Sequence, residues 1–299
     1  MTSSITNCPP ATCSPERHGT WADKMMRRAG ERASAGACRR DDRKLCSGFG
    51  TGQDKPVRAS KMRINGHSAL VAPRVLLVPY SAHHVPTYHA WMQDPAIREA
   101  TASEPLTLDE EYAMQRSWRD DADKLTFIVC IAPPSPTTEI RARVHDAPAA
   151  MIGDVNLFLV PDDDDDDEGD DGRPLAVVGE LEIMIASATH QNRGYGAAVL
   201  SAFMAYIRRR IDGILAEYCT SSTAGPGGAR LSYLRVKIAA TNHPSLRLFE
   251  RAGFVRVSET PNFFGELELR RGLDETKGDE AKGAGAANPV ELGYELAAE

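Results

Sequence analysis

The sequence lacks any apolar run long enough to cross a lipid bilayer. Its longest apolar stretch, around Phe127–Pro134, is far shorter than the roughly 20 residues that a transmembrane helix needs. It also lacks an excess of positive charge, because 35 Lys and Arg residues stand against 42 Asp and Glu residues, a formal net charge of −7. We therefore expect neither a membrane protein nor a protein drawn to nucleic acid by its overall charge.

Cysteine is scarce, and its spacing does not suit a metal site. Four of the six cysteines lie near the N-terminus, where four residues separate Cys8 from Cys13 and seven separate Cys38 from Cys46. Zinc ribbons use pairs separated by two residues, so we expect no zinc site. No basic segment followed by an apolar one precedes these cysteines, which argues against export and a disulfide framework. We expect free thiols and a cytoplasmic protein, with the nucleus as the alternative location.

Charge and composition divide the chain into three parts. Residues 1–61 hold twelve Lys and Arg against six Asp and Glu, without a helical or strand period, and we predict a basic disordered extension there. Its six acids argue against a transit peptide, while Met62 is an alternative start. Residues 62–271 form the predicted folded domain. Residues 272–299 contain a single aromatic residue, Tyr294, and are predicted to be a flexible tail.

An acidic segment interrupts the predicted domain. Nine of the ten residues in 162–171 are Asp or Glu, and like charges repel, so this segment predicts a solvated loop insertion. It lacks the spaced Asp pattern and distal Glu of a calcium loop, so no calcium site is expected.

Hydrophobic periodicity predicts an alternation of strands and helices. Thr107 and Glu110 have the spacing of a capping box and predict the start of a helix. The predicted order is characteristic of an α/β sheet that is partly antiparallel and partly parallel. Predicted strands are 74–79, 125–132, 149–160, 175–186, 231–239, 254–258 and 265–269; predicted helices are 84–92, 108–121, 196–211 and 244–252.

The strongest local motif, Q-N-R-G-Y-G-A, lies between a predicted strand and a predicted amphipathic helix. Glycines in such a turn let the backbone approach a ligand closely, because no side chain intervenes. The helix N-terminus that follows presents unpaired N–H groups and a positive dipole end, which favour an anion such as a pyrophosphate. A turn that merely starts a helix is the alternative. The motif consists of Gln191, Asn192, Arg193, Gly194, Tyr195, Gly196 and Ala197.

A second segment, 240–254, supports the interpretation of the first motif as a ligand-binding turn. Asn242, Ser245 and Phe249 follow the pattern N-x-x-S-x-x-x-[YF], and Gly253-Phe254 comes after them. Together with Q-x-x-G-x-G at 191–196, this segment resembles the GCN5-related N-acetyltransferase (GNAT) superfamily. The resemblance covers about 62–271. Five stretches more narrowly resemble the eukaryotic N-acetyltransferase 9 family, namely 62–65, 77–80, 101–108, 114–119 and 151–158.

The resemblance implies a GNAT-type α/β fold, with a mixed, partly antiparallel central sheet flanked by helices and a splayed pair of central strands. Acetyl-CoA would lie between those strands, with its pyrophosphate on the backbone amides of 191–197. The acetyl group would lie beside Met184, Ile185 and Ala186, whose N–H groups could bind the acetyl oxygen. Asn242 and Ser245 would hold the pantetheine arm or the loop beside it, and Phe249 would belong to the same binding segment.

Two glutamates are the candidates for a general base. Glu180 and Glu182 alternate with apolar residues in a predicted strand, so they share one face, roughly 7 Å apart. Related enzymes often place a catalytic Glu here, while two solvated glutamates are the alternative interpretation. Phe249 stands where many relatives carry a Tyr that acts as general acid. A thiol leaving group, with a pKa of about 8.5 by analogy with Cys, can instead take its proton from water.

The predicted function is acetyl transfer from acetyl-CoA to a protein or peptide amine. Direct attack in a ternary complex is expected, because no cysteine lies in or beside either motif to form an acyl-enzyme. Deprotonating an α-amine at pH 7.4 costs under about 1 kcal/mol, against about 4 kcal/mol for a lysine side chain, so the α-amine is favoured. The net charge of −13 on residues 62–299 would attract a basic partner. The alternatives are a non-catalytic acyl-CoA-binding scaffold and an acetyltransferase for small amines.

Overall fold

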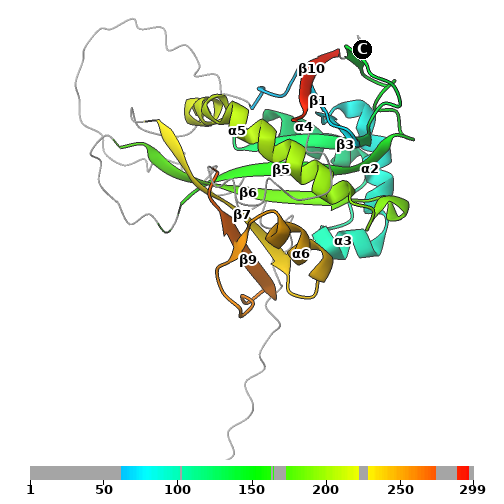
Figure 1. Cartoon of the computed structure of the whole chain (residues 1–299). Helices are drawn as coiled ribbons and strands as arrows, with labels where there is room; N and C mark the ends of the chain where they lie inside the picture. The colour runs from blue at the N-terminus through cyan, green and yellow to red at the C-terminus, as the bar shows by residue number, and fades with distance from the viewer. Residues whose placement is uncertain are drawn as a thin grey trace, which may run out of the picture.

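A computed structural model describes residues 62–101, 103–162, 164, 173–221, 228–273 and 288–295 (Figure 1). The predicted extension 1–61 and most of the acidic insertion lie outside these ranges. The described residues form one ten-stranded sheet in the order β4-β10-β1-β2-β3-β5-β6-β7-β9-β8. The strands are β1 (Ser68–Val71), β2 (Val75–Pro79), β3 (Lys124–Ile131), β4 (Ile140–Arg141), β5 (Met151–Pro161), β6 (Leu175–Ile185), β7 (Ala229–Ala239), β8 (Val255–Arg256), β9 (Glu266–Arg271) and β10 (Val290–Glu295).

Helices cover both faces of the sheet. Residues that alternate along the central strands direct their side chains to opposite faces, which produces two separate apolar cores. The long helix α5 lies across one face, as Figure 1 shows, and α6 packs on the same core, while α2 and α4 contribute to the core on the other face. The helices are α2 (Val85–Met92), α3 (Pro95–Thr101), α4 (Leu108–Asp120), α5 (Tyr195–Ser221) and α6 (His243–Arg251), with short 3₁₀ turns η1 (Ala82–His84) and η2 (Ala188–His190).

The sheet is mixed, which confirms the predicted fold class. The pair β6 and β7 is parallel, as is the short pair of β10 with β4, and the other pairs are antiparallel. The capping box at Thr107 is present, since its hydroxyl accepts from the N–H of Glu110 and the Glu110 carboxylate accepts from the N–H of Thr107. No helix in the described ranges combines the length and apolar character that a bilayer crossing requires.

The predicted tail needs correction. Residues Val290–Glu295 form β10, which pairs with β1 from Ser68 to Val71, and Tyr294 is buried. Strands β1 and β4 and helix α3 were not predicted. Helix α5 was predicted to end at Ile211 but continues to Ser221. The missed strands are only two to six residues long, so their own sequence carries little periodic signal and pairing with neighbours selects them.

Candidate active site

Two neighbouring strands in the centre of the sheet diverge. Strands β6 and β7 pair from Leu175 to Glu180, and among their described residues the pairing ends at Glu180 and Arg235. Beyond this point β6 stays paired with β5 as far as Ile185, and β7 stays paired with β9 as far as Ala239. Among the residues that the structure describes, no strand pairs with the two edges that face each other there. This divergence is the predicted splayed pair of central strands.

Backbone groups of β6 point into the gap. The N–H of Ala186 was predicted to be able to bind the acetyl oxygen. It instead donates to the carbonyl of Ile152 on β5, at 2.9 Å, so it is not available to a ligand. Because successive residues of a strand direct their N–H groups to opposite neighbours, the N–H of Ile185 points toward the gap. The carbonyl of Ile185 accepts a hydrogen bond from Nε2 of Gln191, at 2.8 Å. Gln191 thus ties the turn before α5 to the end of β6.

The turn between η2 and α5 has a backbone that favours glycine. Asn192 has a φ of 56° and Gly194 a φ of 82°, both in the left-handed region. Helix α5 begins at Tyr195, directly after these two left-handed residues and Arg193 between them. The first N–H groups of a helix have no partner within the helix, and its N-terminal end carries a partial positive charge. The turn therefore presents an anion site at the end of the gap.

Arg74 adds a positive charge to this turn, and sequence reasoning missed it. Its Nη1 lies 2.9 Å from the position that a Cβ on Gly194 would take, and its guanidinium carbon lies 4.6 Å from the centroid of the Tyr195 ring. Among the described residues, no carboxylate lies within ion-pair distance of this guanidinium. A cation beside a helix N-terminus is unfavourable without an anion, so the arrangement fits the pyrophosphate of acetyl-CoA. No local sequence signal links Arg74 to a turn 120 positions away.

The residues of the second motif have local structural roles. Asn242 caps α6, because its Oδ1 accepts a hydrogen bond from the N–H of Ser245 at 3.2 Å. Phe249 is only 5% exposed and packs edge-to-face on Phe254 in the core. The side chain of Leu248 lies 3.2 Å from where a Cβ on Gly196 would be, so α6 packs against the start of α5. The second motif therefore holds the α5 turn in place, and direct contact with a ligand remains a prediction.

The two candidate bases occupy different surroundings. Oε2 of Glu180 lies 2.9 Å from Nη2 of Arg235 and 3.4 Å from Nζ of Lys237, so cations on β7 hold this carboxylate at the closed end of the gap. Glu182 is two residues further along β6, beyond the last residue that pairs with β7. It is half-buried and lies opposite Asn156 of β5. Glu182 is therefore the carboxylate placed beside the gap itself.

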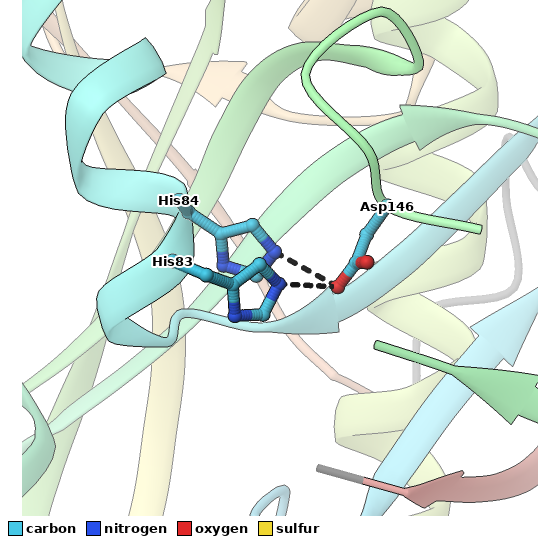
Figure 2. Close-up of side chains that lie close together, drawn as sticks. All are labelled: His83, His84 and Asp146. Atoms are coloured by element: carbon cyan, nitrogen blue, oxygen red, sulfur yellow. Dashed lines mark hydrogen bonds and ion pairs between the residues drawn. The ribbon is translucent and has the colours of Figure 1, made fainter. Parts of the chain in front are cut away.

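A separate cluster, beside the buried Tyr294 of β10, joins His83, His84 and Asp146 (Figure 2). Oδ2 of Asp146 lies 3.0 Å from Nε2 of His83 and 2.9 Å from Nε2 of His84, and it also accepts a hydrogen bond from the hydroxyl of Tyr294. Hydrogen bonds also determine the His84 tautomer. Its Nδ1 accepts from the N–H of Ser81, at 3.0 Å, so its Nε2 carries the hydrogen that it donates to Asp146.

This tautomer disfavours a metal ion at the cluster. A metal on Nε2 of His84 would require a hydrogen on Nδ1, which would face the N–H of Ser81. The cluster instead joins three distant segments, because Tyr294 belongs to β10 and Asp146 to the loop after β4. Burial opposes ionisation of Asp146, but the hydrogen bonds from His83, His84 and Tyr294 outweigh it and hold the pKa of this carboxyl well below its usual range.

We expect Asp146→Asn to destabilise the fold by about 3 kcal/mol or more, because it removes a buried anion from several donors. The depressed pKa means that the unfolded chain binds a proton more readily than the folded chain. The stabilisation is therefore present above about pH 4 and is lost as pH falls further. Urea unfolding at pH 7 and pH 3 checks this, with the exposed Asp109→Asn as control. Equal stability losses at both pH values would contradict the assignment.

Comparison with known proteins identifies the family. A family model described as an acetyltransferase (GNAT) domain matches residues 74–255, which include both motifs. An N-acetyltransferase 9-like protein of Schizosaccharomyces pombe is 38% identical over 228 residues, covering 70% of this chain and 99% of that protein. The protein named alpha/beta-tubulin-N-acetyltransferase 9 is 39% identical over 210 residues in Drosophila melanogaster, covering 70% and 89%, and 36% identical over 222 residues in Homo sapiens, covering 72% and 88%.

The family match covers more than half of the chain, and the geometry agrees with it. The gap between β6 and β7 leads to a positively charged turn at the start of α5, an arrangement that suits a long ligand carrying a pyrophosphate. Acetyl-CoA is the acetyl donor of this family. The chain belongs to the GNAT family of acetyl-CoA-dependent N-acetyltransferases, among the N-acetyltransferase 9 proteins.

Proposed function

We propose that this enzyme acetylates the α-amine of a protein or peptide, by direct attack within a ternary complex. The observation that supports the proposal is the gap between β6 and β7, since Glu182 and Ile185 both belong to the stretch of β6 beyond its last residue paired with β7. Two relatives are named alpha/beta-tubulin-N-acetyltransferase 9, which makes tubulin N-terminal peptides the first substrates to test. An α-amine also needs only a modest base at neutral pH, because its pKa is near 8.

Each group at the gap has a separate task in this proposal. Acetyl-CoA supplies the activated acetyl group. The N–H of Ile185 is directed to bind the acetyl oxygen, and a backbone donor placed where negative charge develops commonly contributes a few kcal/mol. Glu182 accepts the proton of the acceptor ammonium, directly or through one water, which leaves the nitrogen lone pair free to attack. With Phe249 buried in the core, the thiol takes its proton from water.

The proposal is tested with purified protein, acetyl-CoA and peptides that carry a free or a blocked N-terminus. We expect thiol release and a mass gain of one acetyl group on the free α-amine, and none on the blocked peptide that keeps an internal lysine. Turnover of polyamines but not peptides would favour a small-amine acetyltransferase. Binding of acetyl-CoA without thiol release on any amine would favour a non-catalytic scaffold.

Arg74 provides a test of the pyrophosphate site that does not need turnover. We expect Arg74→Ala to weaken CoA binding about 10-fold, because a charge-assisted hydrogen bond contributes about 1.5–3 kcal/mol. Dephospho-CoA should show the same loss, since it lacks the 3′-phosphate but keeps the pyrophosphate. Calorimetry on the variant and on the control Arg141→Ala, at the β4 edge of the sheet, measures both ligands. A loss limited to intact CoA would instead place Arg74 on the 3′-phosphate.

A further inference from the structure

Strand β5 contains a β-bulge beside the open end of the gap. Its pairing with β3 skips Ile152, because Gly153 and Met151 face consecutive residues of β3. A bulge bends its strand, and bulges are common next to active sites, where they redirect neighbouring groups. In the register with β6, Gly153 lies opposite Ile185, the residue whose N–H points toward the gap. The bulge is therefore next to the end of β6 that borders the gap.

Gly153 allows the backbone of β6 to approach β5 closely. A Cβ on Gly153 would overlap the carbonyl oxygen of Met184, and it would lie 2.9 Å from the carbonyl carbon of Met184 and 3.1 Å from Cα of Ile185. All of these atoms belong to the backbone, so no side-chain rotation could relieve the overlap. Glycine within a strand often marks such a close approach. The missing side chain of Gly153 therefore determines where the peptide group between Met184 and Ile185 lies.

Hydrogen bonds restrain the chain that follows this peptide group. The carbonyl of Ile152 accepts from the N–H of Ala186, at 2.9 Å, and from the N–H of Ser187, at 3.3 Å. The carbonyl of Ile185 accepts from Nε2 of Gln191, at 2.8 Å. The end of β6 is thus tied both to the bulge and to the turn before α5, so a displaced peptide group would be displaced relative to that turn.

The same peptide group carries the N–H of Ile185. Any shift that makes room for a Cβ on Gly153 therefore changes the position and the direction of this donor. Such a shift does not require unfolding, because among the described residues no strand pairs with β6 on the side of the gap beyond Glu180. A side chain at Gly153 is thus expected to disturb the donor more than the fold.

We propose that Gly153 is a positioning residue, whose missing side chain keeps the N–H of Ile185 directed at the acetyl oxygen. The inference rests on the proposed function, in which this N–H binds that oxygen. A donor stabilises the developing negative charge only when it points at the position that the oxygen takes, and a displacement of about 1 Å can cost 10²-fold in rate. Gly153 acts through the backbone of β6 and not through contact with the substrate.

The kinetic test compares Gly153→Ala with Gly179→Ala on β6. A Cβ on Gly179 would lie 2.6 Å from Cδ2 of Leu234 and 2.9 Å from Cδ1 of Leu157, which are the ends of flexible side chains. We expect Gly153→Ala to lower kcat about 10- to 100-fold and to leave the KM for acetyl-CoA within about threefold of the wild type. Gly179→Ala should lower the melting temperature but keep kcat within about threefold, because it strains packing and not the donor.

Infrared spectra of bound acetyl-CoA, labelled with carbon-13 at the acetyl carbonyl, detect the hydrogen bond without turnover. A hydrogen bond to the thioester oxygen weakens the C=O bond and lowers its stretching frequency relative to free acetyl-CoA. We expect this lowering in the wild type and in Gly179→Ala, and its loss in Gly153→Ala. Ile185→Pro deletes the same N–H without changing Gly153, so it should lose the lowering too and keeps the test decisive if Gly153→Ala does not fold.

The outcomes separate positioning from packing. A retained lowering or an unchanged kcat in Gly153→Ala overturns the inference, as does a lowering that persists in Ile185→Pro. Equal losses in the two glycine variants would assign Gly153 to packing and overturn it as well. A wild-type enzyme that shows the lowering but releases no thiol with any peptide amine overturns the proposed acceptor instead, while the loss in Gly153→Ala would still support the positioning role.

Discussion

Gly194→Glu is expected to abolish measurable acetyl-CoA binding, with an affinity loss of at least 100-fold. The substitution places a side chain at the anion-facing side of the turn, where even a Cβ would lie 2.9 Å from Nη1 of Arg74. The new carboxylate would pair with Arg74 and occupy the end of α5, so it both fills the anion site and repels a pyrophosphate. Calorimetric titration with acetyl-CoA measures the loss directly.

Two further substitutions separate charge and shape from backbone strain. Gly194 has a φ of 82°, so any side chain there costs about 1–2 kcal/mol of stability. Gly194→Ala has this strain without the charge, and we expect it to weaken binding less than Gly194→Glu does. Gly293→Glu places the same charge on β10, where a Cβ would meet nothing within 4 Å, and should bind acetyl-CoA like the wild type. Unchanged affinity in Gly194→Glu would show that the coenzyme binds elsewhere.

Glu182→Gln is expected to lower kcat about 100-fold or more, since removing a general base typically costs between 10² and 10⁴ in rate. The glutamine keeps the size of the side chain but cannot accept the ammonium proton. Acetyl-CoA affinity should stay near the wild-type value, because Glu182 lies on β6 away from the turn at Gly194. Single-turnover acetylation of a peptide with a free N-terminus, followed by mass spectrometry, measures the chemical step.

Glu180→Gln is the matched comparison, because both glutamates lie on the same face of β6. Its effect should fall on stability, since it leaves Arg235 and Lys237 without their shared carboxylate. We therefore expect a lower melting temperature and a smaller fall in kcat than in Glu182→Gln. A larger kcat loss in Glu180→Gln than in Glu182→Gln would reverse the assignment of the base.

Much of the fold could be predicted because its central elements carry strong periodic patterns. Strands β3, β5 and β6 are long and apolar, and the capping box at Thr107 marks the start of α4. By contrast, β10 is only six residues long and stands in a segment of low hydrophobicity, so its alternating Val290, Leu292 and Tyr294 did not stand out, and it pairs with β1 and β4. The helix α5 was predicted to end at Ile211, yet it continues to Ser221, and its buried Ile214 and Tyr218 pack in the core.

The candidate site was predictable only in part. The turn at 191–194 was evident from its glycines, and the family from the resemblance of the two motifs and of five further stretches to known acetyltransferases. The sequence placed Glu180 and Glu182 on one face but could not distinguish them, because the ion pairs of Glu180 come from β7, more than 50 residues later. Arg74 gave no local signal, since its place at the turn depends on contact with a distant segment.

The sequence by itself determined the family, the mixed α/β class, and the glycine turn that begins the long helix. These features depend on motif spacing and on alternating hydrophobicity, which are patterns of residues close together in the chain. Only the tertiary structure decided which carboxylate lies beside the gap, which arginine faces the turn, and that the C-terminal strand completes the sheet. Those outcomes depend on strand register and on burial, which bring residues far apart in the chain into contact and set the energy of each charge.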